Sequence, residues 1–563
     1  MNINKVARQI TNFAKQFNWL SVKGVIHNFG DNLYRYNLFE NLFRNSQRYI
    51  HYYNNQVYKM APIENEPVAK KPKLDDESLD IMKRLVKERK EAGETVLDVK
   101  FNKKRVQMLS KEQEVSEDSD GIVYWMNRDQ RIQDNWALLF AQRLALKNKM
   151  SLHVAFCLLP SYMEYTYRHY NFMLKGLEEI EKECQTRGIE FHLLYGEPSE
   201  VLPSFIEKHH IGGLVTDFCP LRLAKKQLKE VKKSIPKHVP MCQVDAHNIV
   251  PIWEASDKQE YGARTIRRKI TDQLPTFLTK FPHVTKHKYQ SKHKAESIDW
   301  SAAEKFIDVD RTVGPVDWCT PGTTGGLTNL NEFCLKRLRK FNTSRNDPNV
   351  KAISMMSPWL HFGQVSAQRC ILEAKRYNKQ MSEAVANFIE ETVVRRELSD
   401  NYCFYQENYD NINGAYDWAR NTLNDHKKDK RTHIYSREQF AEAKTHDDLW
   451  NSAQIQLVTE GKLHGFMRMY WAKKVLEWSR SPEEALEIAL YLNDHYALDG
   501  NDPNGFVGVM WSICGIHDQG WAEREVFGKI RFMNYAGCKR KFKINEYISR
   551  YGGKCHKYTP PSK

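Results

Sequence analysis

The sequence predicts an α/β domain with a parallel five-stranded sheet and flanking helices, followed by an all-helical domain. Three observations predict this order. Short apolar runs alternate with amphipathic helical stretches from residue 121 to about 252, a pattern typical of a parallel sheet covered on both faces. Strand signals nearly vanish beyond residue 325, while the helical periodicity continues. The chain has 563 residues, which is enough for two or three domains.

Five apolar runs between residues 121 and 252 predict the strands of the first domain. They are Ile122–Met126, Leu152–Leu159, Ile189–Tyr195, Gly213–Phe218 and Met241–Val250. The helical stretches between them are Ile132–Lys147, Tyr165–Cys184, Val201–His209 and Leu221–Ser234. No Gly-x-Gly-x-x-Gly follows the first strand, so a dinucleotide-binding Rossmann site is not supported.

The second domain is expected over residues 326–552, after a polar, loop-like linker over residues 253–325. Its helical stretches are Leu327–Phe341, Ser366–Tyr377, Met381–Tyr405, Arg437–Ala443, Asp448–Glu460, Leu463–Trp478 and Pro482–Tyr491. The segment Lys529–Lys563 holds ten basic residues against one acid, with aromatic residues interleaved, which fits binding to a phosphate backbone. We expect residues 553–563 to be a solvated tail.

The composition excludes several classes of protein. Hydrophobic residues make up 41% of the chain, so wholesale disorder is not expected, and no run approaches the ~18 apolar residues of a membrane span. The 11 cysteines contain no Cys-x-x-Cys pair, which disfavours a zinc ribbon or a secreted disulfide framework, and we expect no metal. The formal charge of +15 suits a polyanionic partner, although many basic proteins bind no nucleic acid.

Two N-terminal segments carry candidate targeting signals. Residues 1–60 hold eight Lys or Arg against two acids, which is typical of organellar import peptides; a disordered extension is the alternative, and Met60 could be an internal start. Residues 61–119 form a charged linker, for which we expect a helix or loop outside the core. Its cluster Lys70–Lys73 resembles nuclear import signals, which also arise by chance. We therefore expect nuclear protein, with a mitochondrial pool if the first segment acts in import.

Three tryptophans near the predicted helix Leu463–Trp478 are candidate redox groups. Trp471 and Trp478 are seven residues apart, so they share one helix face about 10 Å apart along the axis, and Trp450 lies on the preceding helix. Tryptophans at this spacing more often pack a core than carry electrons.

Charged and hydroxyl side chains suggest an anion site in the same domain. Arg468 needs an anionic partner if it is buried, and Asp499 in a following turn is the candidate. Ser354 and Ser357 open a predicted helix whose Pro358 suits the first turn. Amides and hydroxyls there could bind a pyrophosphate, and ordinary capping by Ser is the alternative.

Eight segments, in order, resemble the class II cyclobutane pyrimidine dimer photolyases of the cryptochrome/photolyase superfamily. They are Arg128–Ala137, Tyr261–Arg267, Ser344–Pro348, Ser354–Gly363, Arg395–Asn401, Leu463–Trp478, Trp511–Trp521 and Gly528–Phe542. The resemblance implies a carbon–carbon lyase for ultraviolet-damaged DNA. It also implies a non-covalent FAD in the helical domain, active when fully reduced and anionic. Excited by light, this FAD sends one electron to the dimer and recovers it. The α/β domain could hold an antenna pigment, a deazaflavin or a folate.

The resemblance also implies roles for individual residues. At the lesion it places Glu391, Met469 and Trp511, with Asn493 facing flavin N5, while Trp471, Trp450 and Trp478 would carry electrons to oxidised flavin. Expected cofactor contacts are Phe341, Ser354, Met355, Met356, Ser357, Phe388, Arg395, Arg468, Asp499, Gly500 and Asn501. Expected DNA contacts are Arg345, Lys529, Arg531, Lys539, Arg540 and Lys541.

Two positions depart from the family pattern, and two other functions stay open. Phe341 replaces a Tyr that usually touches the flavin phosphates, and no Trp lies between Phe388 and Cys403, where many photolyases have a second stacking Trp near the position of Arg395.

A cryptochrome-like flavin photoreceptor that signals through protein partners is the first alternative, but such receptors often carry a long extension after the core. A photolyase for 6–4 photoproducts is the second. We expect a monomer without membrane contact.

Overall fold

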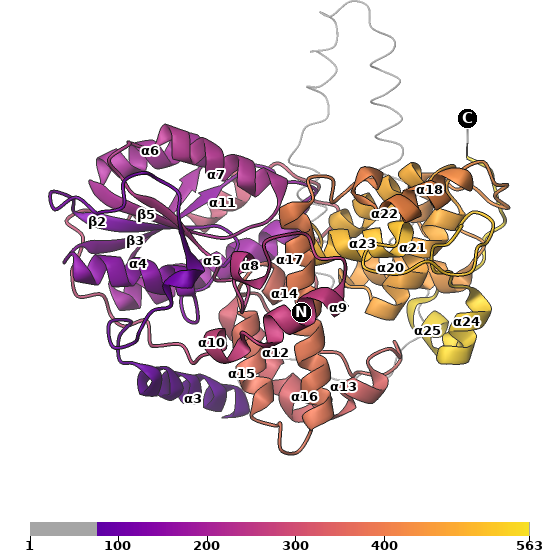
Figure 1. Ribbon diagram of the computed structural model, residues 1–563, viewed down its shortest axis with the longest axis horizontal. Coiled ribbons are helices and arrows are strands. Elements are labelled where there is room, and N and C mark those ends of the chain that lie inside the picture. Colours follow the sequence, from indigo (N-terminus) through magenta and orange to yellow (C-terminus); the bar gives the residue numbers. More distant parts are fainter. Residues whose placement is uncertain (1–75, 562–563) are drawn as a thin grey trace, which may run out of the picture. The chain divides into compact units, whose positions relative to one another are not determined.

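The computed structural model describes residues 76–561 (Figure 1). The predicted import segment and the Lys70–Lys73 cluster lie outside the described residues, so both stay predictions. Within the described part, no helix combines the length and the apolar character needed to cross a membrane.

The α/β region is built on a six-stranded sheet in the order β1-β6-β5-β2-β3-β4. Five strands run parallel where the sequence predicts them: β2 (Gly121–Met126), β3 (Ser151–Leu158), β4 (Glu190–Tyr195), β5 (Ile211–Asp217) and β6 (Met241–Val244). The sixth, β1 (Val106–Met108), pairs antiparallel with β6. The sequence analysis missed it because three residues in a charged segment are too few to show alternation.

The central strand β2 shows why both faces of the sheet are covered. All six of its residues are buried. Ile122 and Tyr124 pack into one hydrophobic core, and Val123 and Trp125 pack into another, as expected from the two-residue repeat of a strand. The covering helices are α4 (Trp136–Lys147), α5 (Tyr167–Arg187), α6 (Pro198–Lys208) and α7 (Arg222–Ser234), with α6 and α7 side by side above the sheet in Figure 1.

Two segments predicted as linkers contribute to the core. Helix α3 (Asp76–Ala92) buries Ile81 and Leu85, so the prediction of a helix or loop outside the core is wrong for this part of the segment. Residues 253–325 are also not simply loops, because Ile266 and Phe277 are buried in the same core. The short helices there are α8 (Ile252–Ala255), α9 (Ala263–Thr271), α10 (Leu274–Phe277) and α11 (Trp300–Phe306).

The C-terminal region of the described chain is helical. Its helices are α12 (Gly322–Glu332), α13 (Leu338–Ser344), α14 (Ser357–His361), α15 (Ala367–Lys375), α16 (Ser382–Ile389), α17 (Arg396–Tyr405), α18 (Asp417–Asp425), α19 (Arg437–Ala441), α20 (Asp448–Glu460), α21 (Gly465–Glu477), α22 (Pro482–Tyr496), α23 (Pro503–Cys514), α24 (Tyr535–Lys541) and α25 (Ile544–Tyr551). The continuous helix predicted over residues 381–405 is present, as α16, the π-helical turn Glu390–Arg395 and α17 in direct succession. Such turns are frequent at functional sites.

The segment after α25 is anchored by its backbone, which differs from the predicted solvated tail. Asn451 Nδ2 donates to the carbonyl of Lys554 at 2.7 Å, and the amide of His556 donates to the carbonyl of Thr445 at 3.0 Å. The side chains of Lys554 and His556 are nevertheless exposed. The tail therefore lies along the helical core with its charges in solvent.

Candidate functional site

A buried charge cluster lies where four segments meet: the start of α14, helix α21, the turn before α21 and the turn after α22. Asp499, after α22, accepts a hydrogen bond from Arg468 Nη2 at 3.0 Å and one from Lys462 Nζ at 2.5 Å. Lys462 also donates to the hydroxyl of Ser357, the first residue of α14. The predicted pairing of Arg468 with Asp499 is therefore present. Lys462 was missed, because a single lysine before a helix carries no pattern.

This cluster carries more positive than negative charge. Burial alone would raise the pKa of Asp499, but Arg468 and Lys462 outweigh it and hold that pKa far below its ordinary value. Burial lowers the pKa of Lys462, and Asp499 opposes that shift. Two cations and one carboxylate leave a surplus positive charge in a buried place, where charges are normally paired. The arrangement suits an anionic ligand.

The start of α14 does not use its serines as caps. Met356 occupies the N-cap position, no side chain caps the helix, and Pro358 lies in the first turn as predicted. Ser354 Oγ accepts from the amide of Met356 at 3.4 Å, whereas Ser357 is engaged with Lys462. Ordinary capping, the alternative to an anion site, is therefore not what the structure shows.

The turn between α22 and α23 is held rigidly against the end of α22. Asp494 accepts from the amide of Asn501 at 2.8 Å and from Asn493 Nδ2 at 2.8 Å, and burial raises its pKa to about 6. Asn493 is 1% exposed. A Cβ at Gly500 would lie 2.8 Å from the carbonyl of Asn493, so only glycine fits there. This network fixes Asn493 and the predicted residues Gly500 and Asn501 together.

Open space lies on the helix faces that carry the predicted lesion residues. A Cβ at Gly508 would meet nothing within 4 Å, and Gly508 precedes Trp511 by three residues on α23. The same is true of Gly465, four residues before Met469 on α21. Residues three and four apart share a helix face, so both helices leave room beside Trp511 and Met469.

Glu391 lies in the π-helical turn between α16 and α17. Its carboxylate is 3.8 Å from Arg345 Nε and its side chain is 46% exposed. Desolvation by the surrounding protein raises its pKa, while Arg395 and Arg345 oppose the shift. Burial lowers the pKa of His464 to about 4. The charge of Lys462 lowers this pKa further, whereas a hydrogen bond with the backbone of Arg345 raises it. Through Arg345 and His464, Glu391 is therefore linked to the Lys462 end of the charge cluster.

The predicted cofactor residues Phe341, Phe388 and Arg395 contact other side chains of the protein, away from the Asp499 cluster. Phe341 and Phe388 pack edge to face at 5.6 Å in a buried aromatic cluster, so the ring of Phe341 packs without the family's hydroxyl. Arg395 pairs with Glu390 at 3.1 Å, and the structure does not bring it to the Asp499 cluster. For these three residues cofactor contact stays a prediction.

The three predicted redox tryptophans form a connected, buried row. The Trp450 and Trp471 rings are nearly parallel with centroids 6.2 Å apart, and Trp450 lies 6.2 Å from Trp478. Trp450 Nε1 donates to the carbonyl of Trp471 at 2.9 Å. The order is therefore Trp471, Trp450, Trp478, with Trp450 between the two residues predicted to share one helix face.

The predicted DNA-contacting cations fall into two groups. Lys529 and the three basic residues Lys539–Lys541, the last three residues of α24, are exposed. Arg531 is held by Asp518 through two hydrogen bonds of 2.8 and 3.0 Å, and its guanidinium lies 4.1 Å above the exposed ring of Trp521. The structure thus adds Trp521, which the sequence analysis noted only as the end of a segment.

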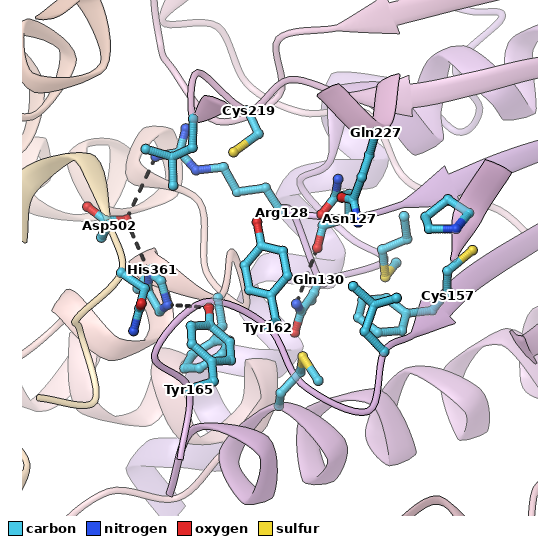
Figure 2. Close-up of a pocket in the computed structure, with 18 of the residues that line it drawn as sticks. Asn127, Arg128, Gln130, Cys157, Tyr162, Tyr165, Cys219, Gln227, His361 and Asp502 are labelled. Atoms are coloured by element: carbon cyan, nitrogen blue, oxygen red, sulfur yellow. Dashed lines mark hydrogen bonds and ion pairs between the residues drawn. The ribbon is translucent and has the colours of Figure 1, made fainter. Parts of the chain in front are cut away.

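A pocket lies at the carboxyl ends of the central strands (Figure 2). Strand β2 has β3 as its neighbour on one side and β5 on the other, so the strand order reverses at β2. In open α/β sheets ligands bind at such a switch point, beside the carboxyl ends of the strands. The pocket wall contains Arg128 and aromatic side chains. Tyr165 Oη lies 2.7 Å from His361 Nε2, and His361 Nδ1 lies 3.1 Å from Asp502, three residues after Asp499. The pocket therefore adjoins the charge cluster.

Comparisons with known proteins agree with this two-part arrangement. A family model described as DNA photolyase matches residues 122–286. The deoxyribodipyrimidine photo-lyase of Potorous tridactylus is 60% identical over 453 residues, which cover 80% of this chain and 85% of that protein. That of Arabidopsis thaliana is 50% identical over 436 residues, covering 76% and 88%. A bacterial class III photolyase from Agrobacterium tumefaciens, of known structure, shares the fold with a TM-score of 0.61 and 16% identity, covering 79% of this chain and 88% of its own.

Proposed function

The chain belongs to the class II cyclobutane pyrimidine dimer photolyases of the cryptochrome/photolyase superfamily, and we propose from this premise that it splits cyclobutane pyrimidine dimers in DNA under light. The observation that carries the proposal is 60% identity to a deoxyribodipyrimidine photo-lyase across both the α/β and the helical regions. Glu391, Met469 and Trp511, which the resemblance places at the lesion, are all present in the chain.

The residues present fit FAD. The surplus positive charge of Lys462 and Arg468 over Asp499 matches a ligand that carries a pyrophosphate and, when reduced, an anionic ring. Bound FAD would supply, in its reduced and excited state, the single electron that opens the dimer and then returns. Lys462 and Arg468 stabilise negative charge on this ligand, while Ser357 offers a hydroxyl at the same place.

Asn493 is the residue that we propose to face flavin N5. Its amide is fixed by Asp494 on the same helix and lies 3.0 Å from where a Cβ at Gly505 would be. A buried and immobilised amide can exchange a hydrogen bond with a ring nitrogen at little further cost in side-chain entropy. Asn493 thus orients the ring.

On the lesion side, Trp511 and Glu391 receive the extruded thymines and Arg345 holds the backbone beside them. The ring of Trp511 can stack on a base, since every base has a π-face. Desolvation raises the pKa of Glu391, so its carboxyl keeps its proton to a higher pH than a free glutamate does. When protonated, it can donate a hydrogen bond to a thymine edge and stabilise added negative charge. Arg345, 3.8 Å from Glu391, can hold a neighbouring phosphate.

Exposed cations hold the damaged strand without reading its sequence. Lys529 and Lys539–Lys541 present ammonium and guanidinium groups to phosphates, whereas Asp518 orients Arg531 over the ring of Trp521. The binding is expected to weaken steeply with salt, because each phosphate that the protein neutralises releases counterions.

Two further roles extend the proposal. The row Trp471, Trp450, Trp478 carries electrons to oxidised flavin and so activates the cofactor. The pocket of Figure 2 takes an antenna pigment, a deazaflavin or a folate, because it combines apolar walls with a few fixed polar groups, as small-molecule sites do. We also propose that the protein acts as a monomer in the nucleus, with a mitochondrial pool directed by residues 1–59.

Exposure of ultraviolet-damaged DNA to purified holoprotein, with and without blue light, tests the proposed function. We expect dimers to disappear only under light. Loss of dimers in the dark, or no loss in the light, contradicts it.

A further inference from the structure

Helix α21 carries a buried lysine, Lys473, that has no part in the repair chemistry described above. Its side chain is 0% exposed. Within residues 76–561 it forms no ion pair, because Asp518, whose charge acts on it, is hydrogen-bonded to Arg531 at 2.8 and 3.0 Å. A buried ammonium without a paired carboxylate is costly, so Lys473 needs an explanation.

The ammonium of Lys473 lies behind the ring of Trp511. Its Nζ is 5.0 Å from the ring centroid, a distance at which a cation is attracted to the face of an indole. Lys473 is fully buried whereas Trp511 is partly exposed, so the ammonium contacts the ring from the protein side. It therefore takes up none of the space in which a base would stack.

A second predicted lesion residue lies on the same helix face. Met469 precedes Lys473 by four residues on α21, and residues four apart share a face. Lys473 is thus next to Met469 on its own helix and next to Trp511 on α23. The sequence analysis assigned both neighbours to the lesion and left Lys473 out.

A purely structural role is the alternative. Lys473 Nζ donates to the carbonyl of Ser512 at 2.9 Å, in the last turn of α23. Carbonyls in a last turn lack partners within the helix, and lysines frequently satisfy them. A lysine kept for this alone should stabilise the fold. By contrast, an apolar side chain of similar volume in place of an unpaired buried charge is often neutral or stabilising.

We propose that Lys473 supplies positive charge that stabilises the extra electron on the dimer, acting through the ring of Trp511. The dimer holds one added electron while the carbon–carbon bonds between its bases break, and the electron then returns to its donor. Lys473 itself gains and loses neither an electron nor a proton. Its charge acts strongly because water is excluded around it. The inference rests on the proposed function.

Lys473 differs from the other cation beside Trp511. The guanidinium of Arg531 is 5.4 Å from the same ring centroid, but Asp518 offsets its charge. Burial lowers the pKa of Lys473 to about 7, Arg531 lowers it further, and Asp518 opposes the shift. Below that pH the amine carries its proton, so the test belongs at mildly acidic pH.

Transient absorption of chemically reduced holoprotein, bound to DNA with a single dimer, tests the proposal. In Lys473→Met, electron transfer to the dimer should slow about tenfold, as a rise of ~1.4 kcal/mol in the barrier would produce. Fewer dimers should be split per absorbed photon. The Kd for damaged DNA and its salt slope should not change, because a buried ammonium neutralises no phosphate. Flavin content and Tm should be no lower than in the wild type.

Lys474→Met is the matched control. Lys474 follows Lys473 on α21 and is only 6% exposed, but its ammonium pairs with Glu477 at 2.5 Å. This variant should split dimers at the wild-type rate once chemically reduced.

Three results would overturn the proposal. If Lys473→Met transfers its electron at the wild-type rate, the charge has no role in repair. If its Tm or flavin content falls well below that of the wild type, Lys473 is an anchor for the end of α23. If the wild type splits no dimers in light, the proposed function itself fails, and this inference fails with it.

Discussion

Replacing Lys462 with Met removes the surplus charge of the cofactor cluster while keeping most of the side-chain volume. Lys462 contacts Asp499 at 2.5 Å and the hydroxyl of Ser357. After the substitution Arg468 and Asp499 remain as a neutral pair. Burying an ammonium costs several kcal/mol, which the variant avoids, so the missing hydrogen bonds and the avoided penalty should nearly offset in the stability of the apoprotein.

The substitution Lys462→Met should weaken flavin binding. Two unit charges ~8 Å apart at an effective dielectric constant of ~20 interact by about 2 kcal/mol, which corresponds to about a 30-fold weaker Kd for an anionic ligand. Flavin fluorescence titration and the flavin content of purified protein measure this. Lys462→Arg should retain most of the affinity. Lys182→Met, which removes an exposed lysine that pairs with Glu178, is the control for net charge. Wild-type affinity in Lys462→Met would refute the assignment of the cluster.

Four further predictions concern the relay, the lesion pocket, the DNA surface and targeting. Trp471→Phe should photoreduce flavin much more slowly and lose about 1–2 kcal/mol of stability, yet repair normally once reduced with dithionite; normal photoreduction would show that the ring only packs. Repair by the wild type should fall as pH rises through the raised pKa of Glu391, because the carboxyl loses its proton, and the pH profile of Glu391→Gln should be flat over that range; identical profiles would exclude this role. Alanine at all of Lys539–Lys541 should weaken binding to damaged DNA and reduce the salt slope by about 0.9 for each phosphate that the variant no longer neutralises; an unchanged slope would place DNA elsewhere. Tagged full-length protein and protein starting at Met60 should distribute differently between mitochondria and nucleus, and identical distributions would refute import by residues 1–59.

The sequence predicted elements that carry a long or regular pattern. Strand β2 and helix α20 are predictable because apolar residues recur through their whole length. Strand β1 is not, since its three residues are stabilised by pairing with β6 rather than by their own pattern. Helix α3 was misjudged for a similar reason: its many charges hide the two residues, Ile81 and Leu85, that the core buries.

For the site, sequence reasoning found residue types but not all partners. The Arg468–Asp499 pair was predicted from a buried arginine's need for an anion, and it is present. Lys462 could not be identified from the sequence, because it contacts Asp499, 37 positions later, only once the chain has folded.

Light-dependent dimer repair by the purified holoprotein tests the central claim most directly. Duplex DNA carrying one defined cyclobutane dimer would be mixed with reduced enzyme and illuminated, with dark samples and the Trp511→Ala and Glu391→Ala variants alongside. The account predicts that the wild type restores the two thymines only in light, and that both variants repair less at equal flavin content. Repair in the dark, or bound flavin without any repair in light, would contradict it.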